Sequence, residues 1–160
     1  MKYDINLNNI KVTNAVASLI NSAFETGLNP SWYYVESLNK DGFLDAAFEE
    51  GGLKTPSGKP AKTTWSFTGC LVDCDDPDEQ VTEPITVTAA YAVNQWIHMA
   101  KNYKTTYLAL KADAYLRMLM ALDEGKDDVA EHILFNQYEP DGVHDDALTQ
   151  YIFATDVVFG

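Results

Sequence analysis

The carboxyl-terminal stretch, residues 144–160, most constrains the fold, because it stays apolar almost to the last residue. Asp145 or Asp146 is the predicted N-cap of a helix here, since a carboxylate accepts hydrogen bonds from unpaired N–H groups at a helix start. Most chain ends are polar and frayed unless they are tied down. We therefore predict that the tail Val157-Val158-Phe159 packs into the core and that the fold closes on it. The predicted helix presents one apolar face, with side chains at three- and four-residue spacing: Leu148, Tyr151, Ile152 and Thr155.

The amino-terminal third of the chain predicts a strand, a helix and a second strand. Residues 2–7 alternate polar and apolar, as a half-buried strand does. Asn8 or Asn9 then begins a helix with a continuous apolar stripe, and Gly27 is placed to end it. The aromatic cluster at 31–35 has high strand propensity and is expected to pack in the core.

The middle of the chain predicts a short helix followed by a hairpin. A helix is expected over residues 43–50, and the Pro-, Gly- and Lys-rich residues 54–62 predict an exposed loop. Residues 65–71 alternate like a half-buried strand, and residues 85–87 are the predicted return strand. Thr88 is placed to cap the helix that follows.

The second half of the chain is predicted to be helical. Residues 89–101 form one helix, residues 105–124 the longest one and residues 127–134 a short one. The helix over 105–124 is apolar on more than one stripe, which predicts either a central position in the core or a subunit interface in a homo-oligomer. The whole chain, 1–160, therefore predicts a single α+β domain, mainly helical with a small antiparallel sheet.

The charge balance constrains the partner. The chain has 24 acidic against 11 basic residues, a formal net charge of −13. A surface this negative repels nucleic acid and anionic lipid, which both bind Lys and Arg patches. We therefore expect no direct nucleic-acid binding and no membrane association, and a protein partner with a basic surface where there is one. The alternative is that the charge only makes the protein soluble.

The sequence also predicts a compartment. No window is apolar over the length needed to cross a bilayer, and the first residues lack the apolar core of a signal peptide. Cys70 and Cys74 are the two cysteines of the chain, and two thiols are more often inert small side chains than a redox pair. The expected location is a reducing cytoplasm.

No motif of a known catalytic or metal site is present in the sequence. The acidic run 73–79 has Pro77 where a calcium loop needs a ligand, and it lacks the glycine of that loop. His98, His132 and His144 have no second histidine or cysteine at helical spacing, so no zinc site is expected. We expect no catalytic residues, no metal and no cofactor, although a carboxylate–histidine site assembled in space stays an alternative.

Two groups of residues are candidates for binding. The first is an acidic face, which could occupy a basic cleft of a partner: Asp123, Glu124, Asp127, Asp128, Glu131, Asp141, Asp145 and Asp146. The second is an aromatic group that could stack on a small molecule or a nucleotide signal: Trp32, Tyr33, Tyr34, Trp65 and Trp96. The structural alternatives are a solvated surface for the first group and core packing for the second.

Three stretches of the chain carry a resemblance to known proteins. They are the ending Asp146-x-x-x-Gln150 followed by Asp156-Val-Val-Phe-Gly160, Gly27 before Trp32-Tyr33-Tyr34, and the span from Trp65 to Thr88. These stretches resemble a group of small acidic phage and prophage proteins of unknown function, whose chains end in an aspartate, a glutamine four residues later and an F-G-E-V-V-[Y/F]-G run. Ala154-Thr155 stands where the group has Phe-Gly, and residues 103–140 are longer than the corresponding span.

The resemblance implies a phage origin and the cytoplasm of a bacterial host cell, but it implies no activity. The first functional hypothesis is a non-enzymatic phage accessory protein that binds a basic partner through its acidic face. By analogy of size and charge, it would inhibit a host defence system of the restriction or CRISPR type. The alternative is a binding protein for a small molecule or nucleotide signal that uses the aromatic group.

Overall fold

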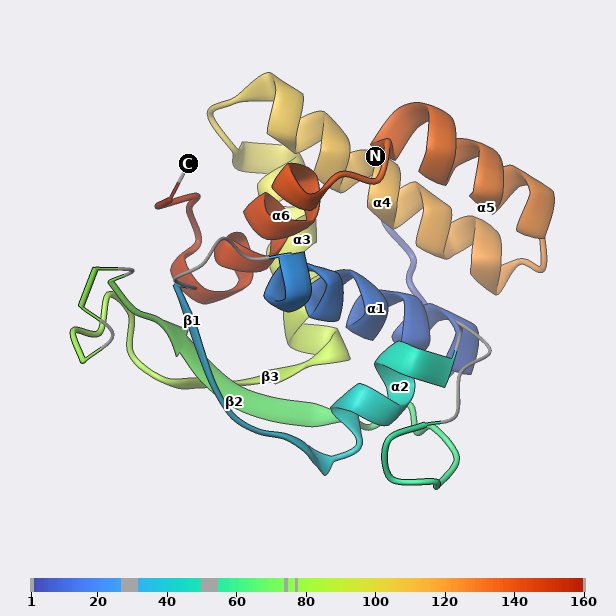
Figure 1. Cartoon of the computed structure of the whole chain (residues 1–160). Helices are drawn as coiled ribbons and strands as arrows, with labels where there is room; N and C mark the ends of the chain where they lie inside the picture. Colours follow the sequence, from blue (N-terminus) through green and yellow to red (C-terminus); the bar gives the residue numbers. More distant parts are fainter. Residues whose placement is uncertain (1, 27–31, 50–54, 74, 77, 160) are drawn as a thin grey trace.

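The computed structural model describes residues 2–26, 32–49, 55–73, 75–76 and 78–159, which fold into one α+β domain, as predicted. Helices α1 to α6, the π-helical turn η1 and three strands follow one another along the chain (Figure 1). Their bounds are α1 Ile10–Thr26, β1 Tyr33–Asp41, α2 Phe43–Glu49, β2 Ser66–Leu71, β3 Ile85–Thr88, α3 Ala89–Asn102, α4 Thr106–Asp123, α5 Asp127–Ile133, η1 Leu134–Tyr138 and α6 Gly142–Ala154.

The strands form an antiparallel sheet in the order β1-β2-β3, in which Tyr33 pairs with Leu71 and Ser66 with Thr88. On β2, Phe67 points into the core, whereas Thr68 lies on the other face. β2 confirms the strand predicted over 65–71, and β3, which pairs with it, confirms the one predicted over 85–87. Thr88 then caps α3, as predicted, because its hydroxyl accepts the Tyr91 N–H at 3.1 Å.

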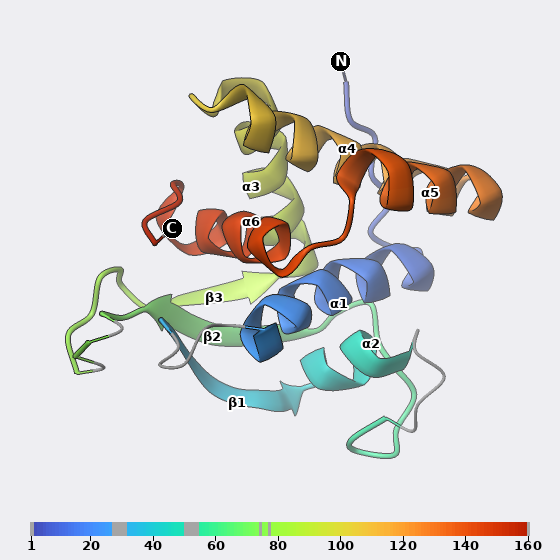
Figure 2. The same ribbon diagram turned by 45° about the horizontal axis from the view of Figure 1, so that its top comes forward.

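Helices α1, α4, α5 and α6 lie in two levels over one face of the sheet, α3 runs between the levels, and α2 lies beside α1 and β1 (Figure 2). Figure 2 shows α1 and α6 next to the sheet, with α4 and α5 on their far side. α4 contacts α1, α3, α5 and α6, and it buries Ala112, Leu116 and Leu119 completely. This central position accounts for its apolar surface on more than one side. A homo-oligomer stays a prediction.

Two predictions for the chain ends are wrong. Residues 2–7 form no strand, because β1 and β3 are the sheet edges in the part of the chain that the structure describes and neither pairs with them. Their alternation is nevertheless real, since Tyr3, Ile5 and Leu7 pack against the core. The helix α6 starts one turn earlier than expected, and its N-cap is Asp141, whose carboxylate accepts the Val143 N–H at 2.8 Å.

The carboxyl-terminal tail is held against the core in part. Val157 and Phe159 pack on the core, and the Phe159 ring stacks on Trp32 with centroids 5.1 Å apart. Val158 is 46% exposed, and Thr155, expected on the buried face, is exposed beyond the end of α6. The other three side chains of the predicted face, Leu148, Tyr151 and Ile152, are buried. The predicted Gly27 cap of α1 lies outside the described residues.

Candidate functional site

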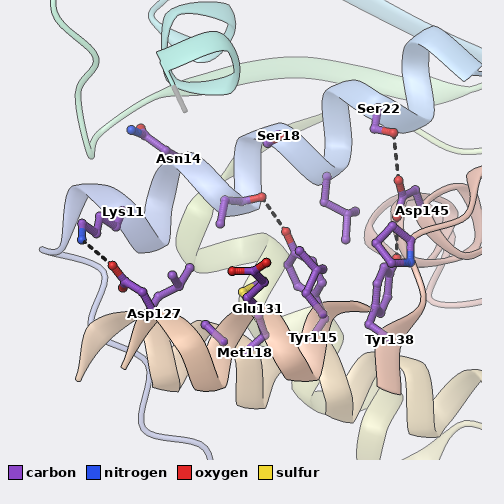
Figure 3. Close-up of a pocket in the computed structure, with 16 residues that line it drawn as sticks. Lys11, Asn14, Ser18, Ser22, Tyr115, Met118, Asp127, Glu131, Tyr138 and Asp145 are labelled. Carbon is purple, nitrogen blue, oxygen red and sulfur yellow. Dashed lines mark hydrogen bonds and ion pairs between the residues drawn. The ribbon is translucent and has the colours of Figure 1, made fainter. Parts of the chain in front are cut away.

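A groove of about 650 Å³ runs between α1 and the helices α4, α5 and η1. Figure 3 shows α1 along one side of it and α5 along the other. Its volume falls in the range of roughly 300–1,000 Å³ that is usual for small-molecule pockets. Its apolar lining comes from three helices and the first residue of η1: Ala15, Leu19, Met118, Leu122, Ala130 and Leu134.

One end of the groove is closed by the carboxylate of Asp145, which is 8% exposed. Tyr138 donates to its Oδ1 at 2.6 Å and Ser22 to its Oδ2 at 2.8 Å, so three separate segments meet there. No basic side chain of the described residues forms an ion pair with Asp145. Burial raises the pKa of the Asp145 carboxyl, although the two hydroxyl donors and nearby His144 favour its charged form.

The local sequence explains how Tyr138 reaches Asp145. The turn η1 inserts a wider π-helical turn after α5, and Glu139 then adopts φ +59, which reverses the chain direction. The buried ammonium of Lys111 donates to the Gln137 carbonyl at 2.9 Å and holds this turn. On its other side His144 Nδ1 lies 2.9 Å from the Glu139 carbonyl, and because a carbonyl only accepts, this nitrogen carries the proton.

The other end and the mouth of the groove are charged. Lys11 Nζ lies 3.5 Å from Asp127 Oδ2, an exposed ion pair that bridges α1 and α5. Figure 3 shows the carboxylate of Glu131 directed from α5 toward the groove between this pair and Tyr115. The Tyr115 hydroxyl donates to the Ala15 carbonyl at 2.7 Å, so it anchors α4 to α1 across the floor.

Five of the predicted acidic residues gather where α4 passes into α5, and we call them the acidic corner: Asp123, Glu124, Asp127, Asp128 and Glu131. Four of them are exposed. The fifth, Asp123, is half-buried and accepts from Asn6 and Asn9 at 3.2 and 3.0 Å, so it also anchors the amino-terminal segment. Glu124 pairs with Lys126 at 3.0 Å.

The remaining three acidic candidates do not extend this surface. Asp141 is exposed but caps α6. The expectation that Asp145 lies on the exposed face is wrong, since it is buried at the end of the groove. Asp146 is half-buried and accepts from Trp32 Nε1 at 3.1 Å and from the Tyr33 hydroxyl at 2.5 Å. Burial raises the pKa of the Asp146 carboxyl despite these donors.

The aromatic candidates mostly serve the core. Trp65 and Trp96 are 1% and 0% exposed, and their indole N–H groups donate to the carbonyls of Thr13 and Leu148. Trp32 is buried beneath Phe159, and Tyr33 is half-buried. Only Tyr34 of the five is exposed, at 53%. None of the five lines the groove.

A second hollow, of about 180 Å³, lies beside the Lys-rich loop and is polar. The carboxylate of Asp45 in α2 lines this hollow and is held in place by three hydrogen bonds. It accepts from the Ser57 N–H at 3.0 Å, from the Ser57 hydroxyl and from Asn39. Burial raises the pKa of the Asp45 carboxyl, but these bonds and the charge of Lys59 outweigh that effect and lower it. The hydrogen bonds make Asp45 a structural tie between α2 and the loop.

The described residues contain no group of three or more His, Cys, Asp or Glu side chains arranged to hold a metal ion. In the same residues, no helix is long and apolar enough to cross a membrane. Cys70 is buried on β2, and Cys74 lies outside the described residues.

Comparison of the chain with known proteins finds no significant match to a family model, to a curated protein or to a solved structure.

Sequence reasoning missed the groove and its closed end. Ser22, Tyr138 and Asp145 come from α1, η1 and α6, and nothing in their spacing along the chain brings them together. One signal was present in the sequence. Tyr115 stands on the apolar face of the longest helix, and because a polar group at a buried position needs a partner, its hydroxyl indicates a contact with another segment.

Proposed function

We propose that this chain is a non-enzymatic binding protein whose acidic corner contacts a protein partner with a basic surface. The observation that supports it best is the concentration of carboxylates where α4 meets α5, with Lys11 and Lys126 as the cations paired to them in the described residues. Such a surface makes the local electrostatic potential more negative and speeds the approach of a basic partner. It does not suit nucleic acid.

Exposed apolar side chains beside these carboxylates support an interface rather than a purely solvated surface. Val129 of α5 is 47% exposed and Ile10, next to Lys11, is 40% exposed. Protein interfaces combine an apolar centre with a polar rim, and carboxylates around Ile10 and Val129 have that composition. A partner that buries both would gain apolar contact as well as charge pairing.

The resemblance to phage proteins extends this proposal to the setting in which the partner is met. The partner would be a basic nucleic-acid-binding protein of a bacterial host, of the kind that acts in restriction or CRISPR defence. The chain would act in the host cytoplasm and occupy the basic cleft of that protein, which nucleic acid would otherwise fill.

The test is capture of a partner from bacterial lysate at low and at high salt, with mass spectrometry of the retained proteins. The test variant is Glu124→Lys/Asp128→Lys, which reverses two exposed corner charges that do not line the groove. The matched control, Asp75→Lys/Asp78→Lys, makes the same change of charge on the exposed turn between β2 and β3. A partner lost only with the corner variant supports the proposal.

Two outcomes contradict the proposal. Equal capture by the parent and both variants would mean that the corner is a solubility feature only. Equal loss with both variants would mean that net charge, and not this surface, determines retention.

A further inference from the structure

We propose that the groove between α1 and α5 binds a small apolar cation, a molecule with an aliphatic or aromatic body and one ammonium or guanidinium group that pairs with Asp145. This site is centred on Asp145 and would take a small molecule, whereas the acidic corner would take a protein partner. It is therefore a second binding site, beyond the proposed function. Three observations lead to it: the closed end, the lining and the distribution of charge.

The closed end supplies the anion. Asp145 is more than nine-tenths buried, and within the described residues its two hydrogen bonds come from the hydroxyls of Tyr138 and Ser22. A carboxylate oxygen has two lone-pair positions, so each Asp145 oxygen has accepted one bond and can accept another. A buried carboxylate without a cation is unfavourable, and a ligand ammonium or guanidinium supplies the missing charge.

The two donors also fix the direction of the carboxylate. Ser22 is on α1 and Tyr138 on η1, so they hold Asp145 from opposite walls of the groove, as Figure 3 shows. A carboxylate positioned in this way needs no reorganisation when a cation arrives. Pre-organisation of this kind lowers the free-energy cost of binding.

The lining supplies the contact for an apolar body. Leu19 from α1, Met118 and Leu122 from α4, and Leu134 from η1 line the groove between its two polar ends. Along α1, Lys11 and Ser22 are roughly 16 Å apart at the usual helical rise. The groove therefore holds an extended chain or a ring system along α1 with its charged group at Asp145.

The distribution of charge selects cations over anions. At the far end Asp127 is already paired with Lys11, so that end is close to neutral. Glu131 has no ion pair within the described residues, and it adds a second carboxylate at the mouth. The ligand cation therefore meets negative potential from the mouth to the closed end.

The experiment is an NMR titration of the full chain, labelled with ¹⁵N, with octylammonium. 1-Octanol carries the same apolar body without charge, and methylammonium carries the charge without the body. We expect octylammonium to give saturating shifts of amides in α1, α4, α5 and η1, and we expect the two reference compounds to bind about tenfold more weakly or worse.

Two variants locate the cation. Asp145→Asn keeps the shape of the side chain and removes its charge; the amide oxygen can accept from one of the two hydroxyls, and the NH2 group can donate to the other. It should weaken octylammonium binding by about tenfold while octanol changes less than about twofold. Asp75→Asn removes the same charge from an exposed site outside the groove and the acidic corner, and it should leave both affinities unchanged. Glu131→Gln is the second variant, exposed and therefore compatible with folding, and should weaken octylammonium alone by about two- to fivefold.

The proposal is overturned if octylammonium gives no saturating shifts, if the shifted amides lie away from the groove, or if octanol binds as tightly as octylammonium. It is also overturned if Asp75→Asn weakens binding as much as the groove variants do, because the effect would then be one of net charge. Should Asp145→Asn not fold, an unchanged affinity of Glu131→Gln would overturn it.

Discussion

The side-chain amide of Gln150 binds the backbone of Phe159 at both of its polar groups. Gln150 Oε1 accepts the Phe159 N–H at 2.8 Å, and Nε2 donates to the Phe159 carbonyl at 2.8 Å. The same Oε1 accepts the Val158 N–H at 2.9 Å, and Nε2 also donates to Asp146 at 2.6 Å. Gln150 is completely buried, so one side chain gives the tail the partners that a strand would otherwise supply.

The first prediction concerns these hydrogen bonds of Gln150. Gln150→Ala removes every one of these bonds and leaves backbone groups of the tail without partners. We expect the free energy of unfolding to fall by about 2–4 kcal/mol, because each buried polar group left unpaired costs roughly 1–3 kcal/mol. Urea unfolding measures it. Gln137→Ala, at an exposed glutamine, is the control and should change the free energy of unfolding by less than about 0.5 kcal/mol. A loss for Gln150→Ala no larger than that of the control would show that these hydrogen bonds do not stabilise the fold.

The second prediction separates two of the three apolar residues of the tail. Phe159 stacks on Trp32 at an interplanar angle of 16°, whereas Val158 is 46% exposed. Phe159→Ala should therefore destabilise the protein by about 1–2 kcal/mol, less than a fully buried phenylalanine, and Val158→Ala by less than about 0.5 kcal/mol. Thermal melts of both variants test this order, and the reverse order would mean that the tail is held by Val158.

The third prediction uses pH. The pKa of Asp145 is raised in the folded state, so the folded chain keeps this proton at pH values at which the unfolded chain has released it. The contribution of Asp145 to stability therefore falls as the pH rises from about 4, the ordinary aspartate value, through its raised pKa. The difference in unfolding free energy between the parent and Asp145→Asn, followed by urea unfolding across this range, should fall with pH.

Asp45 gives the matched comparison, since its pKa is lowered in the folded state. Its stabilisation is complete above about pH 4 and is lost as the pH falls through the lowered value. The parent-minus-variant difference for Asp45→Asn should therefore fall with decreasing pH, opposite in sign to that for Asp145→Asn. Slopes of the same sign would contradict the environments described for one of the two carboxyls.

The sequence predicted the helices well because their apolar residues repeat at helical spacing. The stripe of α1 from Val12 to Ala23 is buried, and Asn9, one of the two expected caps, accepts the Lys11 N–H at 2.9 Å. The alternation of residues 65–71 likewise predicted β2, and β3 was predicted as its return strand. The same pattern failed for residues 2–7, because alternation reports which side chains face the core and does not report whether a neighbouring strand is present.

The site was harder to predict, because it depends on contacts between distant segments. Asp145 and Asp146 are adjacent in a sequence rich in acids, yet both are bound to aromatic hydroxyls, those of Tyr138 and Tyr33. Pairs of this kind carry no local spacing signal. Asp146, Gln150, the tail and the Trp32–Tyr33 cluster hydrogen-bond or stack with one another in the structure, and the sequence predicted no contact between them.

The association rate with the captured partner tests the central proposal most directly. The rate should be measured at increasing ionic strength for the parent, for Glu124→Lys/Asp128→Lys and for Asp75→Lys/Asp78→Lys. Exposed charges are screened over about 8–10 Å near physiological salt. We predict a rate that falls steeply with salt for the parent and the control variant, and a slow rate with little salt dependence for the corner variant. Identical salt dependence for all three proteins would contradict a functional acidic corner.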